Sequence, residues 1–467
     1  MTHLRDTTRR AFSTAFVVSV IAMCATALFA QAAGRLPEPP KPEESKPDDK
    51  PAVDAAKKEN DKKETKDEKP DRYFAVVNAN VHTVTSGDLN GAMLLTKNGK
   101  IYRVGQSLDL PKDTETLDVK GLHVYPGLIA AGTGNVLGSG RPDDTTDVYG
   151  LFMTMALAGG ITTMISDNTA AKLTFGSVED MIVKRDLFKS IRYSSDDPDG
   201  RRKVRQGLEK VRQYVRDLQL HEEAKKADPK AKEPEKDWLK GEHETYLKLI
   251  RHEAVAELTA NSAHELLQIS ELARQFDIHV VVRGAMEGWT VAPQMSRAKL
   301  SAIITPRRRQ EPDERLNRPT GSSIENAAVL YNHGVPLAIV PSTTAITTWG
   351  VAGRDLLQLN MEAAFAVRGG LPNDAALRAI TIDAARILGI DHRVGSIEVG
   401  KDGDLIVVDG DPLHYMTLVR WTIVNGRVVY DKDKEPLYSH IRPDGNRDAP
   451  PPDDYWPRRL GAPVSGN

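Results

Sequence analysis

Apolar residues recur along residues 73–430 in two kinds of pattern, one typical of strands and one typical of helices. Short, mostly apolar runs predict strands at 74–77, 92–95, 101–104, 124–131, 254–258, 279–282, 302–304 and 335–340. Residues 262–276 place apolar side chains near helical spacing, which predicts an amphipathic helix. Strands that alternate with helices imply a parallel sheet, so the middle of the chain has the pattern of an α/β protein.

Two Asn-Gly pairs punctuate the flanks of this region. Asn98-Gly99 and Asn425-Gly426 each separate two apolar runs, and this dipeptide is the strongest short-range signal for a tight β-hairpin. We therefore expect β-rich structure on both sides of the α/β region.

Residues 1–33 have the composition of an export signal. Arg9-Arg10 lies in a segment that resembles the twin-arginine motif, residues 15–30 are apolar, and Ala30-Gln31-Ala32 fits a cleavage site. The alternatives are an ordinary secretory signal and an uncleaved anchor. We expect an exported protein of the periplasm or cell envelope, with membrane contact only through an uncleaved signal.

Two further segments lack the apolar residues that a folded core needs. Residues 34–72 are rich in Pro, Lys, Glu and Asp, which predicts a disordered linker. Residues 441–467 are Pro-rich and predict an irregular tail. The linker is most simply a tether between the envelope and the folded domain, and binding to an anionic polymer is the alternative.

Charge and cysteine content limit the kinds of partner and metal ligand that the chain can have. The chain of 467 residues carries 63 Lys and Arg against 65 Asp and Glu, so its net charge of -2 gives no general argument for a nucleic-acid partner. The one cysteine, Cys24, lies in the predicted leader. A chain cut after it would hold no disulfide, thiolate ligand or cysteine nucleophile, and a metal site would have to use His, Asp and Glu.

Four motifs in the α/β region and its C-terminal flank occur in a familiar order. They are P-G-L-I at 126–129, G-G-I-T-T at 159–163, A-A-R-I-L-G at 384–389 and G-K-D-G-D-L at 400–405. Together they resemble the amidohydrolase superfamily, and in particular its imidazolonepropionase-like secreted members. Proteins of this superfamily hydrolyse carbon–nitrogen bonds, with one or two divalent metal ions such as Zn²⁺ activating water.

The resemblance implies a fold as well. We expect an α/β protein with an amidohydrolase-like (β/α)8 TIM barrel over residues 123–389 and a charged helical insertion at about 200–251. A small β-sandwich formed by the N- and C-terminal flanks, residues 73–122 and 390–440, would stand beside the barrel.

The metal-ligand positions of the superfamily are substituted in this chain. The resemblance places a His-x-His pair after the first barrel strand, histidines after the fifth and sixth strands, and an aspartate after the eighth. These places fall on Gly132, Gly134, Thr259, Arg283 and Ser342. Glycine has no side chain and a guanidinium has no lone pair to offer, so we expect no metal cofactor.

Polar residues near the predicted strand ends could give the barrel mouth another role. The candidate pocket contains Asp167, Arg283, Glu287 and Ser342, with Asp167 and Arg283 pairing across the mouth. A satisfied polar network, an anion or carboxylate pocket centred on Arg283, and metal-free hydrolysis with Ser342 as nucleophile all remain open.

Three functional hypotheses follow. The leading one is a non-catalytic binding or assembly subunit that takes a small carboxylate or amide ligand, or pairs with an active amidohydrolase relative. The second is a hydrolase of carbon–nitrogen bonds with a rebuilt site, either metal-free or holding a metal through carboxylates such as Asp167 and Glu287. The third is a purely structural envelope protein.

Overall fold

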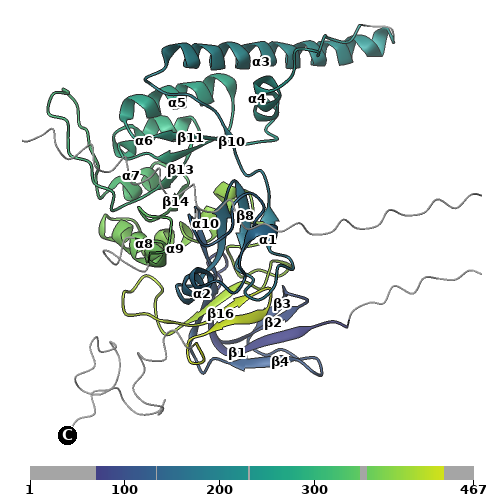
Figure 1. Ribbon diagram of the computed structural model, residues 1–467, viewed down its shortest axis with the longest axis vertical. Helices are drawn as coiled ribbons and strands as arrows, with labels where there is room; N and C mark the ends of the chain where they lie inside the picture. Colours follow the sequence, from purple (N-terminus) through teal and green to yellow (C-terminus); the bar gives the residue numbers. More distant parts are fainter. Residues whose placement is uncertain (1–69, 133, 230–231, 348–354, 436–467) are drawn as a thin grey trace, which may run out of the picture. The chain divides into compact units, whose positions relative to one another are not determined.

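The computed structural model describes residues 70–132, 134–229, 232–347 and 355–435 (Figure 1). The predicted export signal, all but the last three residues of the predicted linker, and the predicted tail lie outside these residues. Within the described ranges, no helix is both long and apolar enough to cross a membrane.

Arg72, the last residue of the predicted linker, is held by the folded chain. Its Nη2 donates to the carbonyl of Asn425 at 2.6 Å, and its backbone N–H donates to Oδ1 of Asn98 at 2.8 Å. The predicted linker therefore extends too far, because Arg72 joins the two Asn-Gly hairpins.

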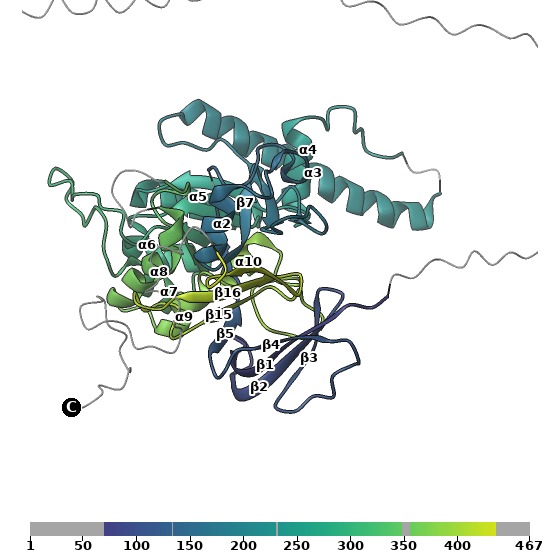
Figure 2. The same ribbon diagram turned by 60° about the horizontal axis from the view of Figure 1, so that its bottom comes forward.

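Strands from both flanks form one mixed eight-stranded sheet, the composite sheet. Its order is β17-β16-β15-β5-β1-β2-β3, with β4 beside β1. The strands are β1 (Tyr73–His82), β2 (Asp88–Lys97), β3 (Lys100–Gly105), β4 (Glu115–Asp118), β5 (His123–Pro126), β15 (Leu405–Val408), β16 (Val419–Val424) and β17 (Arg427–Asp431). Antiparallel pairing of β15 with β5 joins the flanks, and Figure 2 shows these strands side by side.

Two further sheets supply the barrel strands. One has the order β6-β7-β8-β9 and the other is the parallel sheet β10-β11-β12-β13-β14. The strands are β6 (Leu128–Ala130), β7 (Ile161–Ser166), β8 (Thr169–Lys172), β9 (Ile182–Lys184), β10 (Lys189–Ser190), β11 (Ala256–Ala260), β12 (Val280–Gly284), β13 (Ser301–Ile304) and β14 (Leu337–Ile339).

Hydrogen bonds outside the strand ladders connect these two sheets. Ile339 N–H donates to the carbonyl of Ala379 at 3.1 Å, and Ile129 N–H donates to the carbonyl of Ile380 at 2.8 Å, so residues 379–380 lie between β14 and β6. At the other edge, Asn168 after β7 donates through Nδ2 to the carbonyl of Phe188 at 2.8 Å, just before β10. The strands thus follow one another around a barrel.

Alternation along the strands separates an inner core from an outer one. The inner cluster includes Ile129, Ile165, Val281, Ile303 and Ala338, one residue from each of five strands. Their sequence neighbours pack outward with the helices in a second, larger cluster. Because successive strand residues point to opposite faces, odd-numbered residues of β11 and β12 face the barrel interior.

Ten α-helices are described. They are α1 (Pro142–Thr145), α2 (Leu151–Ala158), α3 (Pro198–Ala227), α4 (Glu242–Ile250), α5 (Ala263–Phe276), α6 (Gly288–Arg297), α7 (Asn326–Asn332), α8 (Leu359–Arg368), α9 (Asn373–Arg378) and α10 (Ile382–Leu388). A 3₁₀ turn, η1 (Leu356–Gln358), precedes α8. The predicted helix at 262–276 is α5, with Ser262 as its N-cap.

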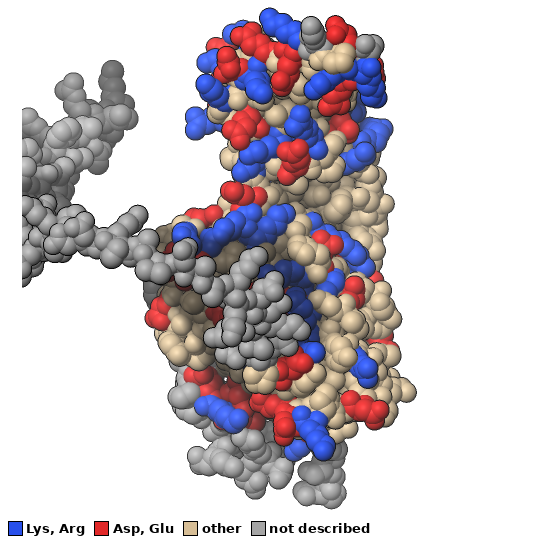
Figure 3. Space-filling model, turned by 90° about the vertical axis from the view of Figure 1, so that its right-hand side faces the viewer, with Lys and Arg blue, Asp and Glu red and all other residues tan. Residues whose placement is uncertain are grey.

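The charged insertion is helical, as the sequence predicts, and consists of α3 and α4. Asp197 caps α3 by accepting from Gly200 N–H at 2.8 Å, and Leu208 and Val211 in its first half are buried. Residues 222–226 in its second half are exposed. Basic and acidic side chains alternate at the top of Figure 3, where Figure 1 places α3. Neither sign of charge dominates this surface.

A buried ionic network joins the composite sheet to β8. Nζ of Lys172, a fully buried side chain, lies 2.8 Å from Oδ2 of Asp402 and 2.9 Å from Oδ2 of Asp180. Arg393 and Lys100 also pair with Asp402. Burial alone would raise the pKa of Asp402, but these cations outweigh it and hold its pKa below the usual value.

Candidate functional site

Arg283 lies at the mouth of the barrel, near the C-terminal end of β12. It stands opposite Thr259 of β11 in the parallel ladder. Side chains of 257, 259, 281 and 283 all face the interior, because these residues alternate with outward-packing ones. As expected, Arg283 and Thr259 lie near the ends of neighbouring strands.

The guanidinium of Arg283 connects three strands. Its Nε and Nη2 donate to Oε1 of Glu257 at 3.1 Å and 2.7 Å, and its Nη1 donates to the carbonyl of Ala131 at 3.0 Å. The side chains of Arg283 and Glu257 are 32% and 29% exposed, so water reaches the pair. A positive charge with a fixed acidic partner therefore stands at the end of β6, where the superfamily carries its first metal ligands.

Gly132 borders this guanidinium, and Gly134 borders Ala345. A Cβ atom at Gly132 would lie 3.7 Å from Nη1 of Arg283 and 3.4 Å from Cγ2 of Thr344. At Gly134 a Cβ atom would lie 3.3 Å from that of Ala345, and the Gly134 N–H donates to the carbonyl of Thr344 at 3.0 Å. A side chain at position 132 would therefore begin in van der Waals contact with Thr344 and with the Arg283 guanidinium.

Ser342 follows β14 and is exposed, as is Thr343 after it. The chain then reaches Thr344 and Ala345, the two residues that border the glycines. The superfamily ligand positions thus fall on two neighbouring parts of the mouth. Gly132 and Thr259 lie beside Arg283, while Gly134 lies beside the segment that follows Ser342.

Asp167 does not pair with Arg283, contrary to expectation. It occupies the turn between β7 and β8 with a φ of 42°, is exposed, and accepts the backbone N–H of Gly140 at 2.6 Å. Arg283 pairs with Glu257 instead. The carboxylate of Asp167 therefore orders the loop after β6.

Glu287 lies away from the Arg283 pair, at the N-cap of α6. Only 3% exposed, it accepts the N–H groups of Ala263 and Gly321 at 2.8 Å and 2.9 Å and pairs with Arg318 at 2.9 Å. Burial alone would raise the pKa of Glu287, but these donors outweigh it and the pKa lies below its usual value. Its bonds hold the start of α5 and the loop after β13, so it too has a structural role.

Glu257 is the site residue that sequence reasoning missed. It lies inside the predicted apolar strand at 254–258, between the apolar residues Ala256 and Leu258. A carboxylate in such a run is rarely buried without a partner. That rule, applied together with Arg283 on the next strand, could have identified the pair.

The side chains at the mouth do not match the donor set of a divalent cation. A metal in this family would need imidazole nitrogens and a carboxylate, whereas Gly132, Thr259 and Arg283 offer a hydrogen atom, a hydroxyl and a guanidinium. Across the described part of the chain, no group of three or more His, Cys, Asp or Glu side chains could hold a metal ion.

Two histidines meet in the composite sheet instead. Nε2 of His82 lies 2.9 Å from Nδ1 of His123, and Nδ1 of His82 lies 2.9 Å from Oδ2 of Asp88. Burial, followed by the neighbouring His82, lowers the pKa of His123. The pair links β1 to β5 and therefore has a structural role in the composite sheet.

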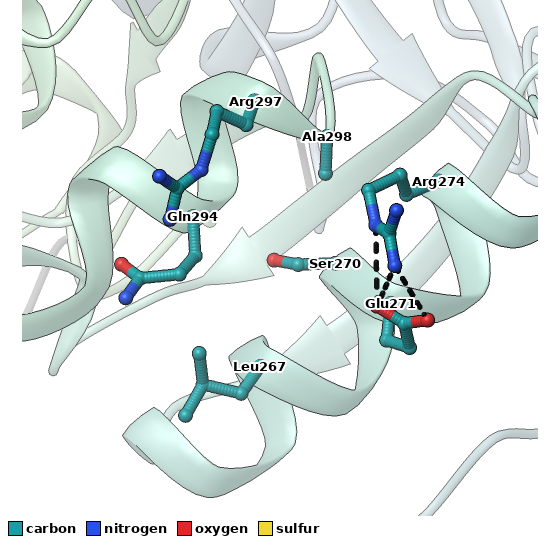
Figure 4. Close-up of a pocket in the computed structure, with 7 residues that line it drawn as sticks. All are labelled: Leu267, Ser270, Glu271, Arg274, Gln294, Arg297 and Ala298. Atoms are coloured by element: carbon teal, nitrogen blue, oxygen red, sulfur yellow. Dashed lines mark hydrogen bonds and ion pairs between the residues drawn. The ribbon is translucent and has the colours of Figure 1, made fainter.

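A separate groove runs between α5 and α6, on helices that cover the outside of the barrel strands (Figure 4). Arg274 is tied to Glu271 at 2.8 Å along one wall, and Gln294 and Arg297 line the other. None of the functional-site residues predicted from the sequence lines this groove.

Comparison with known proteins agrees with the fold. The sequence profile of the amidohydrolase family matches residues 312–441. An imidazolonepropionase of Picrophilus torridus is 47% identical over 62 residues, or 12% of this chain and 16% of that protein. One of Thermoplasma volcanium is 29% identical over 124 residues, or 24% of this chain and 28% of that protein.

The solved structure of an amidohydrolase from Thermotoga maritima MSB8 covers 77% of this chain and all of its own, with a TM-score of 0.57 and 23% identity. That likeness concerns the fold alone. Barrel and composite sheet together define the α/β-barrel fold of the amidohydrolases. The chain belongs to the amidohydrolase superfamily. Its matches to the two imidazolonepropionases span 16% and 28% of their length.

Proposed function

We propose that this protein is an exported member of the superfamily that has lost the metal-dependent reaction and acts as a non-catalytic binding or assembly subunit. One observation carries the proposal: the Arg283 guanidinium lies beside Gly132, tied to Glu257 and to the carbonyl of Ala131. The positive charge of the Arg283 side chain thus lies where the family would bind a metal ion.

Electrostatics support this proposal. A guanidinium stays protonated at every accessible pH and offers no lone pair, so it repels a divalent cation instead of binding it. Its charge is in turn countered by Glu257. We infer that the pair keeps the barrel mouth ordered without a metal ion, and that the water-activating step of the family has no equivalent here.

The export part of the proposal rests on residues 1–33. Their basic start, apolar run and small-residue cleavage site support delivery to the periplasm or cell envelope. Cell fractionation tests it: the chain should follow envelope markers, and recovery with cytosolic markers would contradict it.

Catalysis is tested on the purified full chain with amides, lactams and dipeptides, with and without added Zn²⁺. We expect no hydrolysis above the rate without protein. Hydrolysis that disappears in Ser342→Ala but survives in Thr343→Ala, the neighbouring exposed hydroxyl, would establish the metal-free hydrolase instead. Hydrolysis that requires Zn²⁺ would contradict the proposal directly.

Assembly is tested by copurification from the native envelope. We expect a relative that retains the His-x-His pair to accompany the chain in a complex of fixed stoichiometry. Recovery of this chain as a monomer would count against an assembly role and leave only ligand binding.

A further inference from the structure

The positive charge of Arg283 is balanced within the protein. Arg283 and Glu257 stand 2.7 Å apart and cancel each other. Asp167, an exposed carboxylate near a strand end, is bonded to Gly140 N–H. The other exposed side chains at the described strand ends include the hydroxyls of Thr259, Ser342 and Thr343. The Arg283–Glu257 pair therefore offers a ligand no net charge.

The pair also keeps free hydrogen-bonding capacity. A guanidinium has five N–H donors, and Arg283 uses three of its N–H bonds on Glu257 and Ala131. Both bonds to Glu257 end on Oε1, so Oε2 receives none from Arg283. The mouth therefore presents a group that only donates beside a group that only accepts.

Hydroxyl groups are the ligand chemistry that fits such a pair. A hydroxyl both donates and accepts, so two neighbouring hydroxyls can receive an N–H of Arg283 and donate to Oε2 of Glu257. A carboxylate would meet the charge of Glu257 across a few ångströms, and an ammonium would meet that of Arg283.

We propose that Glu257 determines the charge of the ligand: the barrel mouth binds a neutral polyhydroxy molecule and rejects anions. This rests on the proposed ligand-binding role and replaces the carboxylate pocket that the sequence suggested. The selective element is the acidic partner of Arg283, because without it the same guanidinium would favour carboxylates.

Three probes with one carbon skeleton test this claim: glucitol, gluconate and glucamine, which end in a hydroxymethyl, a carboxylate and an ammonium group. Calorimetric titration of the full chain at low ionic strength should show glucitol binding, with gluconate and glucamine each weaker by about tenfold. In Glu257→Gln, which keeps the size of the side chain, gluconate should become the preferred probe.

Two variants serve as controls. Asp167→Asn makes the same change of net charge elsewhere at the strand ends and should leave the order of the probes unchanged. Glu257→Asp keeps the charge and should still reject gluconate. Melting temperatures of all variants show whether each has folded.

Gluconate binding to the wild type as tightly as glucitol would overturn the proposal, as would binding of no probe at all. An unchanged probe order in folded Glu257→Gln would do the same. These outcomes are distinct from failure of the non-catalytic role, which shows itself as hydrolysis and does not depend on probe charge.

Discussion

Arg283 and Glu257 form an ion pair that contributes to stability only while both side chains are present. Each sits on the inner face of a barrel strand beside apolar neighbours such as Val281. Removing one partner leaves the other charge partly desolvated. Since both side chains remain about one-third exposed, solvent screens much of the effect.

A double-mutant cycle measures this dependence. Arg283→Met and Glu257→Gln are each expected to lower the free energy of unfolding by about 1 to 2 kcal/mol, and together by less than the sum, with a coupling of about 1 kcal/mol. Denaturant titrations at pH 7 provide the values. Strict additivity would show that the contact contributes nothing.

Glu287 gives a prediction that depends on pH. Its pKa in the folded protein is lower than the reference value of 4.5. A depressed carboxyl pKa stabilises the fold fully above the unfolded pKa, and the contribution disappears as pH falls through the folded pKa. Glu287→Gln should therefore cost about 2 kcal/mol at pH 7, and the difference should shrink below pH 4.5.

The matched control is Glu325→Gln, because Glu325 is exposed and its side chain makes no capping bond to α7. Its effect on unfolding should stay small at both pH values. If Glu287→Gln lost stability equally at pH 7 and pH 3.5, the bonds from Ala263, Gly321 and Arg318 would not be the cause.

Single residues show how far sequence reasoning reaches. Gly132 and Arg283 were aligned with ligand positions from the motifs alone, and the structure brings them within contact distance. The sequence predicts Asp167 as the partner of Arg283, because both residues lie near predicted strand ends. In the structure, Asp167 lies in the turn after β7 and accepts a hydrogen bond from the Gly140 N–H instead. Glu257 was missed, since its meaning depends on the register between β11 and β12.

Helix α5 depends on a reciprocal cap at its start. The Ser262 side chain accepts from Glu265 N–H, and the Glu265 carboxylate accepts from Ser262 N–H at 3.1 Å. Ser262→Ala is expected to lower stability by about 1 kcal/mol, because it removes the cap. Ser262→Thr keeps a hydroxyl and should cost less. Thermal unfolding of both variants checks this, and equal losses would contradict it.

Elements were predictable where a period extended over enough residues. The pattern at 262–276 gave α5 almost to its ends, and Asn98-Gly99 and Asn425-Gly426 gave the hairpins β2–β3 and β16–β17. The short strand β10 was out of reach. It has two residues and is defined by its pairing with β11 and not by its own pattern.

The molecule as a whole is held together by contacts far apart in sequence. Lys172 of β8 is fully buried against Asp402 of the C-terminal flank. Lys172→Met is expected to lower the free energy of unfolding by about 3 kcal/mol, because the buried carboxylate of Asp402 loses one of its three cationic partners. Such a network cannot be read from either segment alone.

Lys97→Met is the matched control for this change. Lys97 pairs with Asp71 at 2.7 Å, but both side chains are solvent-exposed. Because solvent screens this pair, its loss should change stability far less than the loss of Lys172 does. Equal effects of the two variants in chemical denaturation would show that the buried network does not couple sheet and barrel.

The account depends most on whether the barrel mouth takes up a metal ion. Elemental analysis of the purified full chain, after dialysis against Zn²⁺ and then metal-free buffer, measures this directly. We expect well below about one metal ion per chain, because Arg283 holds the place with a permanent charge. About one tightly held equivalent of Zn, Fe or Mn, retained by the wild type, would contradict the account.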